Sequence, residues 1–471
     1  MGVGRDVSET REIERRMAYL AHHDSLTGLA NRYRFYEALV TALGPDGENA
    51  PEVALFYFDL DDFAGINDTE GHRRGDKVLQ EISRRICAEV RDGDLVARIG
   101  GDEFGVLITT RADDTVLEER ALQLLGVVRE PVVVGSRQFR LSASVGVARC
   151  LSEPCDADEL MRRADLSLHA AKARGRDEFA MFDHDIDREA HMRRQIESDL
   201  ADALSREEFR LHYQPVIDLK HGSTIGYEAL LRWEHPERGL IYPDEFLSVA
   251  EETGIILPLG KWVVRQALQE IGSWDGDFRI AINLSPSQLR DPTLTETIKE
   301  AIDSSGVAAG RVEFEITEQV LLEDAELGLE TMRSLRALGA QIALDDFGTG
   351  FSSLSYLRTF PFDRIKIDRT FVTDVVESET ARAIVSTITR LADALGSTTT
   401  AEGVEEPQQL NLLRKLGCHE AQGYLILKPV PPKQLDAAHL KGIDLPDLGS
   451  DIIRYRRARR AALKRQGGRA A

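Results

Sequence analysis

The second half of the chain carries polar and charged residues at the ends of short apolar segments. The segments are HYQPVIDL, IGYEALLRW, FRIAINLSP, RVEFEITE, QIALDDFG, FDRIKID, STTTAEGVE and AQGYLIL, and their ends supply Glu228, Asn283, Glu315, Asp345, Asp346, Lys366, Asp368, Glu402 and Gln422. Oxygen ligands without His or Cys select hard cations, namely magnesium or manganese. In the adjacent pair Asp345 and Asp346, one carboxylate can bridge two ions while its neighbour holds the second.

This acidic set is suited to phosphoryl chemistry. Two ions activate a water molecule and stabilise the charge that builds on a phosphoryl group during in-line attack. Lys366 could orient or deprotonate that water and partly offset the acids. Each acid alone is equally compatible with an exposed strand end or a helix cap. Together they favour a site, because Glu315, Asp345 and Glu402 each follow an apolar strand interior at the same structural phase.

The elements that must position these residues are the eight apolar segments themselves. With helical stretches between most of them, they extend over about 240 residues and match a (β/α)8 barrel. The carboxyl ends of barrel strands meet at one mouth, so side chains from distant parts of the sequence converge there. We therefore expect the acids to form one site.

Seven ordered motifs in this half resemble the EAL phosphodiesterases, which hydrolyse the bacterial messenger cyclic di-GMP to linear pGpG. They are EALLRW (228–233), INLSP (282–286), FEITE (314–318), DDFGTGFSS (345–353), IKID (365–368), AEGVE (401–405) and QGY (422–424). The resemblance covers roughly residues 200 to 440. The segment LILKPVP after QGY departs from the aromatic-then-small pattern of the family.

The resemblance implies roles for the residues that match. The first metal would be held by Glu228, Asn283, Glu315 and Asp345, and the second by Asp345, Asp346 and Glu402. Lys366 would hold the nucleophilic water, and Glu318 would anchor the loop DDFGTGFSS. The resemblance also implies that three residues contact the substrate or support those that do, namely Gln422, Gln214 and Arg232.

The first half of the chain carries a second acidic set. The strand VALFYFD ends at Asp59, which Asp61 and Asp62 follow closely, and the turn RIGGDEF presents Asp102 and Glu103. Acids from neighbouring strand ends suit a magnesium pair that holds a nucleoside triphosphate and activates a 3′-hydroxyl. Gly100 and Gly101 permit a tight turn close to a ligand. A GGDE turn alone is equally compatible with an ordinary hairpin tip.

Alternating periodicities predict an α+β domain around this set. We expect helices at 31–43, 73–90, 115–128 and 158–173, strands at 53–59, 95–98 and 104–109, a hairpin at 132–148 and a short final strand. A charged helical stretch, 184–205, then leads to the barrel.

This half resembles the GGDEF diguanylate cyclases over about residues 20 to 183, whose domain is palm-like. The matching motifs are HHDSLTGLANR (22–32), FDLDDFAGINDTEGHRRGD (58–76), GGDEF (100–104) and AKARGR (171–176). The resemblance implies that metal is bound by Asp59, Asp102 and the Leu60 carbonyl, that Glu103 supports catalysis, that Asn67 and Asp76 read guanine, and that Lys172 and Arg176 contact phosphates. A two-fold product made from two GTP implies a homodimer.

Two details refine this interpretation. Arg91 and Asp94, which are followed by five residues and then GGDEF, match the family's product-inhibition site for cyclic di-GMP, although RDGD is also good turn composition. Ala64 stands where the family usually has a lysine, which makes cyclase activity less certain than hydrolysis.

Composition sets the remaining limits. The 471 residues carry a net charge of −21, which disfavours binding of nucleic acid polymers. No apolar run is long enough for membrane insertion, and the N-terminus lacks a secretory core, so we expect a cytoplasmic protein. The four cysteines lack metal spacing and are expected to be idle thiols. Residues 452–471 form a basic tail, either solvated or available for docking.

The domains are therefore expected at 1–20 (helical segment), 21–183 (GGDEF), 184–205 (helical linker), 206–445 (EAL) and 446–471 (basic tail). The leading hypothesis is an enzyme that makes and hydrolyses cyclic di-GMP with two Mg²⁺ or Mn²⁺ ions in each active site. One alternative is a GGDEF domain that only binds GTP and activates the EAL domain. Another is a non-catalytic cyclic di-GMP receptor.

Overall fold

The computed structural model describes residues 16–17, 19–44, 53–109, 113–149, 155–318, 325–348, 360 and 362–435. The chain divides into two compact units, residues 1–194 and 195–471, with the boundary inside helix α7 (His184–Ala203). Expectations for the loop residues 349–353, for most of the N-terminal helical segment and for the basic tail fall outside the described residues.

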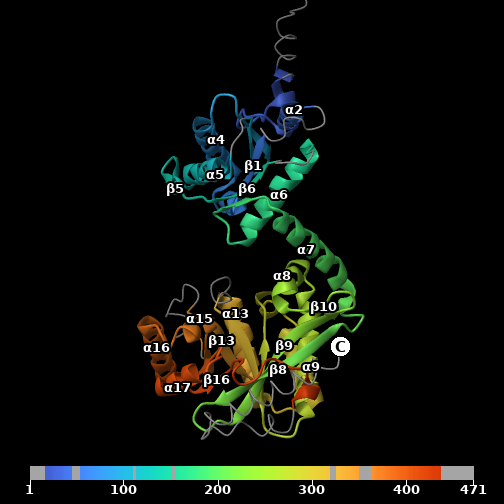
Figure 1. The fold of residues 1–471 in the computed structure, drawn as a ribbon, viewed down its shortest axis with the longest axis vertical. Helices are drawn as coiled ribbons and strands as arrows, with labels where there is room; N and C mark the ends of the chain where they lie inside the picture. The colour runs from blue at the N-terminus through green and yellow to red at the C-terminus, as the bar shows by residue number, and fades with distance from the viewer. Residues whose placement is uncertain are drawn as a thin grey trace, which may run out of the picture. The chain divides into compact units, whose positions relative to one another are not determined.

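Unit 1 is an α+β domain with one five-stranded sheet in the order β2-β3-β1-β6-β7. The strands are β1 (Ala54–Leu60), β2 (Leu95–Gly100), β3 (Glu103–Ile108), β6 (Ala143–Arg149) and β7 (Phe179–Met181). The helices are α2 (Arg32–Leu43), α3 (Phe63–Glu70), α4 (His72–Glu89), α5 (Asp114–Arg129) and α6 (Ala157–Ala173). Central strand β1 is buried on both faces, because α4 and α5 cover one face and α2 and α6 cover the other (Figure 1).

The expected hairpin at 132–148 is wrong in its extent. Strands β4 (Val132–Val134) and β5 (Arg137–Phe139) form a separate two-stranded hairpin, whereas β6 pairs with β1 in the main sheet. The reason is burial: β4 and β5 are largely exposed, while six of the seven residues of β6 are buried and complete the core. The helix α3 between Phe63 and Glu70 was not expected from the sequence.

Unit 2 is a closed eight-stranded barrel, which confirms the expected fold class. The order β9-β11-β12-β13-β14-β15-β16-β8 closes through pairing of β8 with β9, and β10 (Gly239–Ile241) is added outside β9. The strands are β8 (Phe209–Asp218), β9 (Thr224–His235), β11 (Arg279–Asn283), β12 (Val312–Thr317), β13 (Gln341–Phe347), β14 (Arg364–Ile367), β15 (Thr398–Ala401) and β16 (Glu420–Ala421).

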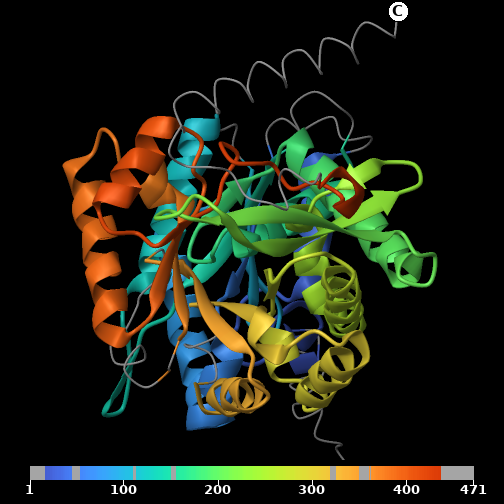
Figure 2. The same ribbon diagram turned by 90° about the horizontal axis from the view of Figure 1, so that it is seen from below.

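The barrel departs from eight parallel strands at β8, which is antiparallel to both neighbours. The short connection from β8 to β9 leaves no room for a crossover helix, so the two strands form a hairpin. The remaining neighbours are parallel, and helices lie around the outside of the strands (Figure 2). These are α8 (Pro243–Thr253), α9 (Ile256–Gly272), α10 (Pro286–Leu289), α11 (Leu294–Ser305), α13 (Ala325–Ala337), α15 (Arg369–Thr373), α16 (Glu379–Leu395) and α17 (Pro407–Lys415), with short 3-10 helices η3 (Ala309–Arg311) and η4 (Pro432–Gln434).

The cysteines and the search for membrane spans bear on two expectations. Cys87 and Cys418 are free thiols, but Cys155 is disulfide-bonded, which corrects the expectation of an idle thiol there. Among the described residues, no helix combines the length and apolar character needed to cross a bilayer.

Candidate active site

The candidate site of unit 2 lies at the carboxyl ends of the barrel strands, around the ammonium group of Lys366. The Nζ atom lies 2.8 Å from Glu315, 3.2 Å from Asp345, 2.7 Å from Glu402 and 3.8 Å from Glu228. These residues come from β9, β12, β13 and the end of β15, so strand topology alone brings them together. Lys366 is only 2% exposed.

Two amides complete the wall of the site at β9. Asn283 Nδ2 donates to Glu228 at 2.8 Å, and Gln422 Nε2 donates to the other oxygen of Glu228 at 2.5 Å. Gln422 also donates to Gln214 at 3.0 Å, and Gln214 donates to the Leu427 carbonyl at 3.0 Å. The structure thus joins Glu228 to Asn283, Gln422 and Gln214 in one network.

A β-bulge brings the adjacent acids Asp345 and Asp346 into the same site. Neighbouring residues of a regular strand point to opposite faces. Here the pairing of β13 with β14 shifts register between Leu344 and Phe347, and Asp346 adopts a left-handed φ of 54°. Ligand atoms of Asp345, Asp346 and Glu402 consequently lie within 4.8 Å of one another. Carboxylates grouped in this way fit a divalent cation.

Burial and mutual repulsion shift the pKa values of these acids. Burial, together with nearby acids, raises the pKa of Glu402 to about 8 and that of Glu315 well above its usual value. Burial also raises the pKa of Asp346, with Asp345 adding to the effect. Although burial opposes it, the surrounding carboxylates hold the pKa of Lys366 well above normal. The single ammonium of Lys366 is too little positive charge to neutralise these carboxylates, and bound cations would supply the remainder.

Arg232 lies beside this site beneath an aromatic ring. It is 7% exposed, its Nη1 donates to the Leu231 carbonyl at 2.7 Å, and its Nε has no hydrogen-bond partner among the described residues. Its Cζ lies 5.0 Å from the ring centroid of Tyr242, which is 50% exposed. A buried guanidinium with a free donor suits a phosphate. Tyr242, the N-cap of α8, was missed because a single tyrosine before a helix carries no distinctive sequence signal.

For two predicted site residues, Glu318 and Asp368, the structure does not show the expected contact with the site. Glu318 is buried directly after β12, but the loop that it was expected to anchor is outside the described residues beyond Gly348. Asp368 does not contact Lys366; it caps α15 by accepting from the backbone N–H and the hydroxyl of Thr370.

In unit 1, Asp59 at the end of β1 pairs with Lys172 from α6 at 2.8 Å. Burial raises the pKa of Asp59 despite that lysine, and Asp102 adds to the effect. The backbone N–H of Leu60 donates to the Asp102 carbonyl at 3.3 Å, so the three expected metal ligands, Asp59, Leu60 and Asp102, lie on adjoining segments. Lys172, expected to contact phosphate, here neutralises Asp59.

Two side chains that sequence analysis missed, Tyr57 and Arg98, hold the GGDEF turn and its surroundings. The Tyr57 hydroxyl donates to Glu103 at 3.0 Å. Arg98 donates to the Gly101 carbonyl through two nitrogens, at 2.8 and 2.7 Å. Gly101 has a φ of 37°, which favours glycine. Asp61 accepts from Ser142, Ser144 and a backbone N–H of the turn after α6, and it is buried, so it is structural. Tyr57 and Asp61 stand two residues before and two residues after Asp59 in the sequence. This alternation, which is typical of a buried strand end, is the sequence signal that the two residues share.

The expected guanine-reading residues lie close together. Asn67 on α3 packs against Gly75 on α4, where an added Cβ would lie 2.0 Å from the Asn67 side-chain oxygen, and Asp76 is the next residue. Arg176 follows α6 in a turn with a φ of 63°. At the expected inhibitory site, the Arg91 N–H donates to Asp94 at 3.2 Å, which closes the RDGD turn.

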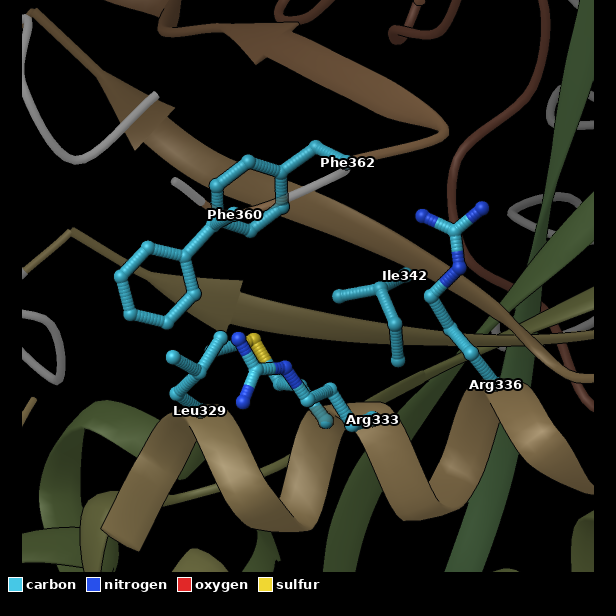
Figure 3. Close-up of a pocket in the computed structure, with 7 residues that line it drawn as sticks. Leu329, Arg333, Arg336, Ile342, Phe360 and Phe362 are labelled. Atoms are coloured by element: carbon cyan, nitrogen blue, oxygen red, sulfur yellow. The ribbon is translucent and has the colours of Figure 1, made fainter. Parts of the chain in front are cut away.

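A cavity in unit 2 lies elsewhere. It is bounded by α13, the start of β13 and the segment just before β14, with Leu329, Met332, Arg333, Arg336, Ile342, Phe360 and Phe362 around it (Figure 3). Ile342 begins β13, whereas Asp345 and Asp346 lie toward its end. The cavity is therefore separate from the acidic site.

Fold and site together define a two-domain protein with an α+β domain bearing a GGDEF turn and a barrel bearing a buried acidic site. Residues 21–178 match the family model for the diguanylate cyclase GGDEF domain, and residues 197–429 match that for the EAL domain. The chain belongs to the tandem GGDEF–EAL family, which confirms the resemblance seen in the sequence.

Two relatives show the extent of the similarity. An uncharacterized signaling protein of Caulobacter vibrioides is 40% identical over 428 residues, which are 91% of this chain and 53% of that protein. The bifunctional diguanylate cyclase/cyclic di-GMP phosphodiesterase MucR of Pseudomonas aeruginosa is 39% identical over 430 residues, 90% of this chain and 62% of MucR. This chain thus spans only part of the length of these relatives.

Solved structures agree with the fold. The PaMucR phosphodiesterase in complex with c-di-GMP is 40% identical, with a TM-score of 0.50, and covers 51% of this chain and 100% of that one. The Vibrio cholerae LapD S helix-GGDEF-EAL structure bound to c-di-GMP has a TM-score of 0.62 at 20% identity and covers 89% of this chain and 100% of that one, which supports the fold alone.

Proposed function

We propose that the EAL domain hydrolyses cyclic di-GMP to pGpG with two Mg²⁺ or Mn²⁺ ions. The observation that carries this proposal is the placement of the Lys366 ammonium within 3.2 Å of Glu315, Asp345 and Glu402 at the mouth of the barrel. An acidic site with one central lysine is suited to metal-assisted attack of water on a phosphodiester. The names of MucR and of its solved phosphodiesterase domain give independent support.

The ligand sets follow the distribution of the acids. Glu228, Asn283, Glu315 and Asp345 would hold one ion, and Asp345, Asp346 and Glu402 the other. Ionised, these five carboxylates and Lys366 leave four negative charges, which two divalent cations would balance. When bound, such ions would stabilise negative charge on the phosphoryl oxygens and favour ionisation of a water.

The chain's own residues supply the rest of the chemistry. Lys366 Nζ would orient the attacking water and exchange a proton with the neighbouring carboxylates, since it lies within 3.2 Å of three of them. Arg232 would bind a phosphate oxygen through its unpartnered Nε. The network from Gln214 through Gln422 would keep Glu228 oriented, because each amide has a defined partner.

The test is formation of pGpG from cyclic di-GMP by the purified chain with Mg²⁺, with Glu228→Ala as the inactive control. Absence of pGpG under every Mg²⁺, Mn²⁺ and GTP condition would contradict the proposal. The same assay with Asp346→Asn asks whether the bulged aspartate is needed, and a loss of at least a hundredfold is expected.

For the GGDEF domain we propose condensation of two GTP to cyclic di-GMP by a homodimer. Asp59, Asp102 and the Leu60 carbonyl would hold metal and Glu103 would support catalysis, with Asn67 and Asp76 at guanine. Gly100 and Gly101 would let the backbone approach the nucleotide, while Lys172 and Arg176 would contact its phosphates. Arg91 and Asp94 would bind cyclic di-GMP as an inhibitor.

A second candidate function for this domain is GTP sensing without condensation. Two observations favour it: Ala64 replaces the usual lysine, and Lys172 is engaged by Asp59. Synthesis measured in a Glu228→Ala background, with and without Asp102→Asn, separates the two. Synthesis that Asp102→Asn abolishes means cyclase activity. GTP that stimulates hydrolysis without any synthesis means a sensor.

A third candidate is a non-catalytic cyclic di-GMP receptor or scaffold in the cytoplasm that signals through its short N-terminal helical segment or its basic tail, and it is weakened by the retained acids. It requires binding without turnover. Tight binding of cyclic di-GMP together with no hydrolysis in Mg²⁺ or Mn²⁺ would support it, and normal hydrolysis after removal of residues 452–471 would leave the tail at most a docking role.

A further inference from the structure

Below the candidate site, the barrel interior contains four charged side chains where branched apolar residues usually fill such barrels. Arg279, Glu313, Arg364 and Glu420 come from β11, β12, β14 and β16. Glu313 is 1% exposed, Arg364 and Glu420 are each 5% exposed, and the Arg279 side chain is 14% exposed. We call these four residues the charged layer.

The four charges alternate around a closed set of contacts. Arg364 spans both acids, with Nη1 against Glu313 and Nη2 at 2.8 Å from Glu420. Arg279 contacts the same two acids, at 2.8 Å from Glu420 and 3.4 Å from Glu313. The Thr400 hydroxyl donates to Glu420 at 2.9 Å. The layer is electrically neutral and, together with Thr400 of β15, it connects five strands of the barrel.

The charged layer lies directly beneath the site along these strands. Alternate residues of a strand point to the same face. Glu313 precedes Glu315 by two residues, Arg364 precedes Lys366 by two, and Glu420 precedes Gln422 by two. Thr400 likewise precedes Glu402 by two. Each strand that carries Glu315, Lys366, Gln422 or Glu402 to the site is therefore held by a hydrogen bond or ion pair two residues earlier.

We infer that the charged layer positions the metal ligands by holding the strands in register. Apolar packing in a barrel is non-directional and tolerates small shifts, whereas a guanidinium bridging two carboxylates fixes distance and angle. Well-packed apolar residues can replace a buried ion network at no loss of stability, so stability alone does not explain it. The inference rests on the proposed function in one respect, namely that Glu315 and Glu402 are metal ligands.

The test compares the Mn²⁺ affinity of variants of the full chain with that of the parent, measured by calorimetric titration. Every chain carries Asp59→Asn, which removes a proposed metal ligand of the GGDEF domain. One variant replaces the whole layer with Arg279→Met, Glu313→Leu, Arg364→Met and Glu420→Leu. A second, Arg364→Lys, keeps the charge but cannot span both acids. The matched control, Arg210→Met with Glu234→Leu, removes an exposed ion pair between β8 and β9.

Both layer variants are expected to weaken Mn²⁺ binding by about tenfold to a hundredfold, as loss of outer-sphere support generally does, while the control binds like the parent. A folded layer variant with parental Mn²⁺ affinity would overturn the inference. If the fourfold variant does not fold, Arg364→Lys decides alone. Should Arg364→Lys also unfold the chain, the layer serves stability and the positioning role is wrong.

A kinetic measurement separates this inference from the proposed function. At saturating Mn²⁺, displaced Lys366 and Gln422 are expected to keep the kcat for pGpG formation reduced, with a smaller change in KM. A parent chain that binds Mn²⁺ but never forms pGpG would contradict the proposed function and leave the comparison of affinities valid.

Discussion

The Nζ atom of Lys366 lies 2.7 Å from the Glu402 carboxylate, the shortest of its contacts with the surrounding acids. Glu402 is the acid whose pKa is raised to about 8, and burial is the main cause. This pair joins two of the functions proposed for the side chains of the site, which are cation binding and handling of a proton.

Replacing Lys366 by Met separates these two functions. Hydrolysis of cyclic di-GMP is expected to fall by at least about a hundredfold, the usual effect of removing a proton-transferring group. Mn²⁺ binding is expected to be unchanged or tighter, because one positive charge leaves an acidic cluster. Calorimetric titration and pGpG formation measure the two effects, and weaker Mn²⁺ binding would mean that Lys366 instead maintains the ligand geometry.

Calcium is expected to inhibit the EAL domain. Ca²⁺ accepts more ligands at longer and more variable distances than Mg²⁺, and it would relax the geometry that in-line attack requires. Hydrolysis in Mg²⁺ should fall as Ca²⁺ is added and recover with excess Mg²⁺. Equal turnover in the two ions would contradict a mechanism with two tightly held cations.

Gly146→Ala is expected to destabilise the GGDEF domain by about 3 kcal/mol. Gly146 lies on β6, and an added Cβ would lie 2.0 Å from the Ala164 carbonyl oxygen and 2.3 Å from the Leu168 nitrogen on α6. The helix would have to move off the sheet. Gly126→Ala in α5 is the matched control, because no atom lies within 4 Å and helix propensity predicts a gain of about 0.5–1 kcal/mol. Scanning calorimetry of each full-length variant measures both effects, and an unchanged transition for Gly146→Ala would refute the packing argument.

Stability should depend on pH through Glu159 at the start of α6. Hydrogen bonds from Arg162 and Arg163, at 2.7 and 2.6 Å, lower its pKa to about 2 although burial opposes the change. Because the folded pKa lies below the unfolded value, the carboxylate stabilises the fold above about pH 4.5, and this contribution is lost as the pH falls toward 2. Solvent screening limits it to about 1 kcal/mol. Glu159→Gln should cost that amount at pH 7 and nothing near pH 2 in urea unfolding, and an equal cost at both pH values would exclude the ionic origin.

Much of this architecture was predictable because it depends on local pattern. Seven of the eight apolar segments contain all or most of a barrel strand, and the alternation that points Glu315 into the barrel is visible in VEFEIT of β12. The eighth segment, AQGYLIL, shares only Ala421 with the short strand β16. The antiparallel β8 was not predicted, since strand direction depends on the length of a connection and not on the strand's own residues. The separate hairpin of β4 and β5 was missed because Val132–Val134 of β4 has the apolar composition of a buried strand.

The types of the site residues, the order of the strands along the chain and the family could be predicted from the sequence alone, since they follow from periodicity and from matching motifs. The sequence does not predict how Asp345 and Asp346, which are adjacent in a strand, reach one site. Their convergence requires the register shift in β13 and the left-handed φ of Asp346, which are seen in the three-dimensional structure. The structure also shows that Arg279 and Arg364, which are 85 residues apart in the sequence, bridge the same two acids. Such contacts depend on barrel closure, which no local pattern encodes.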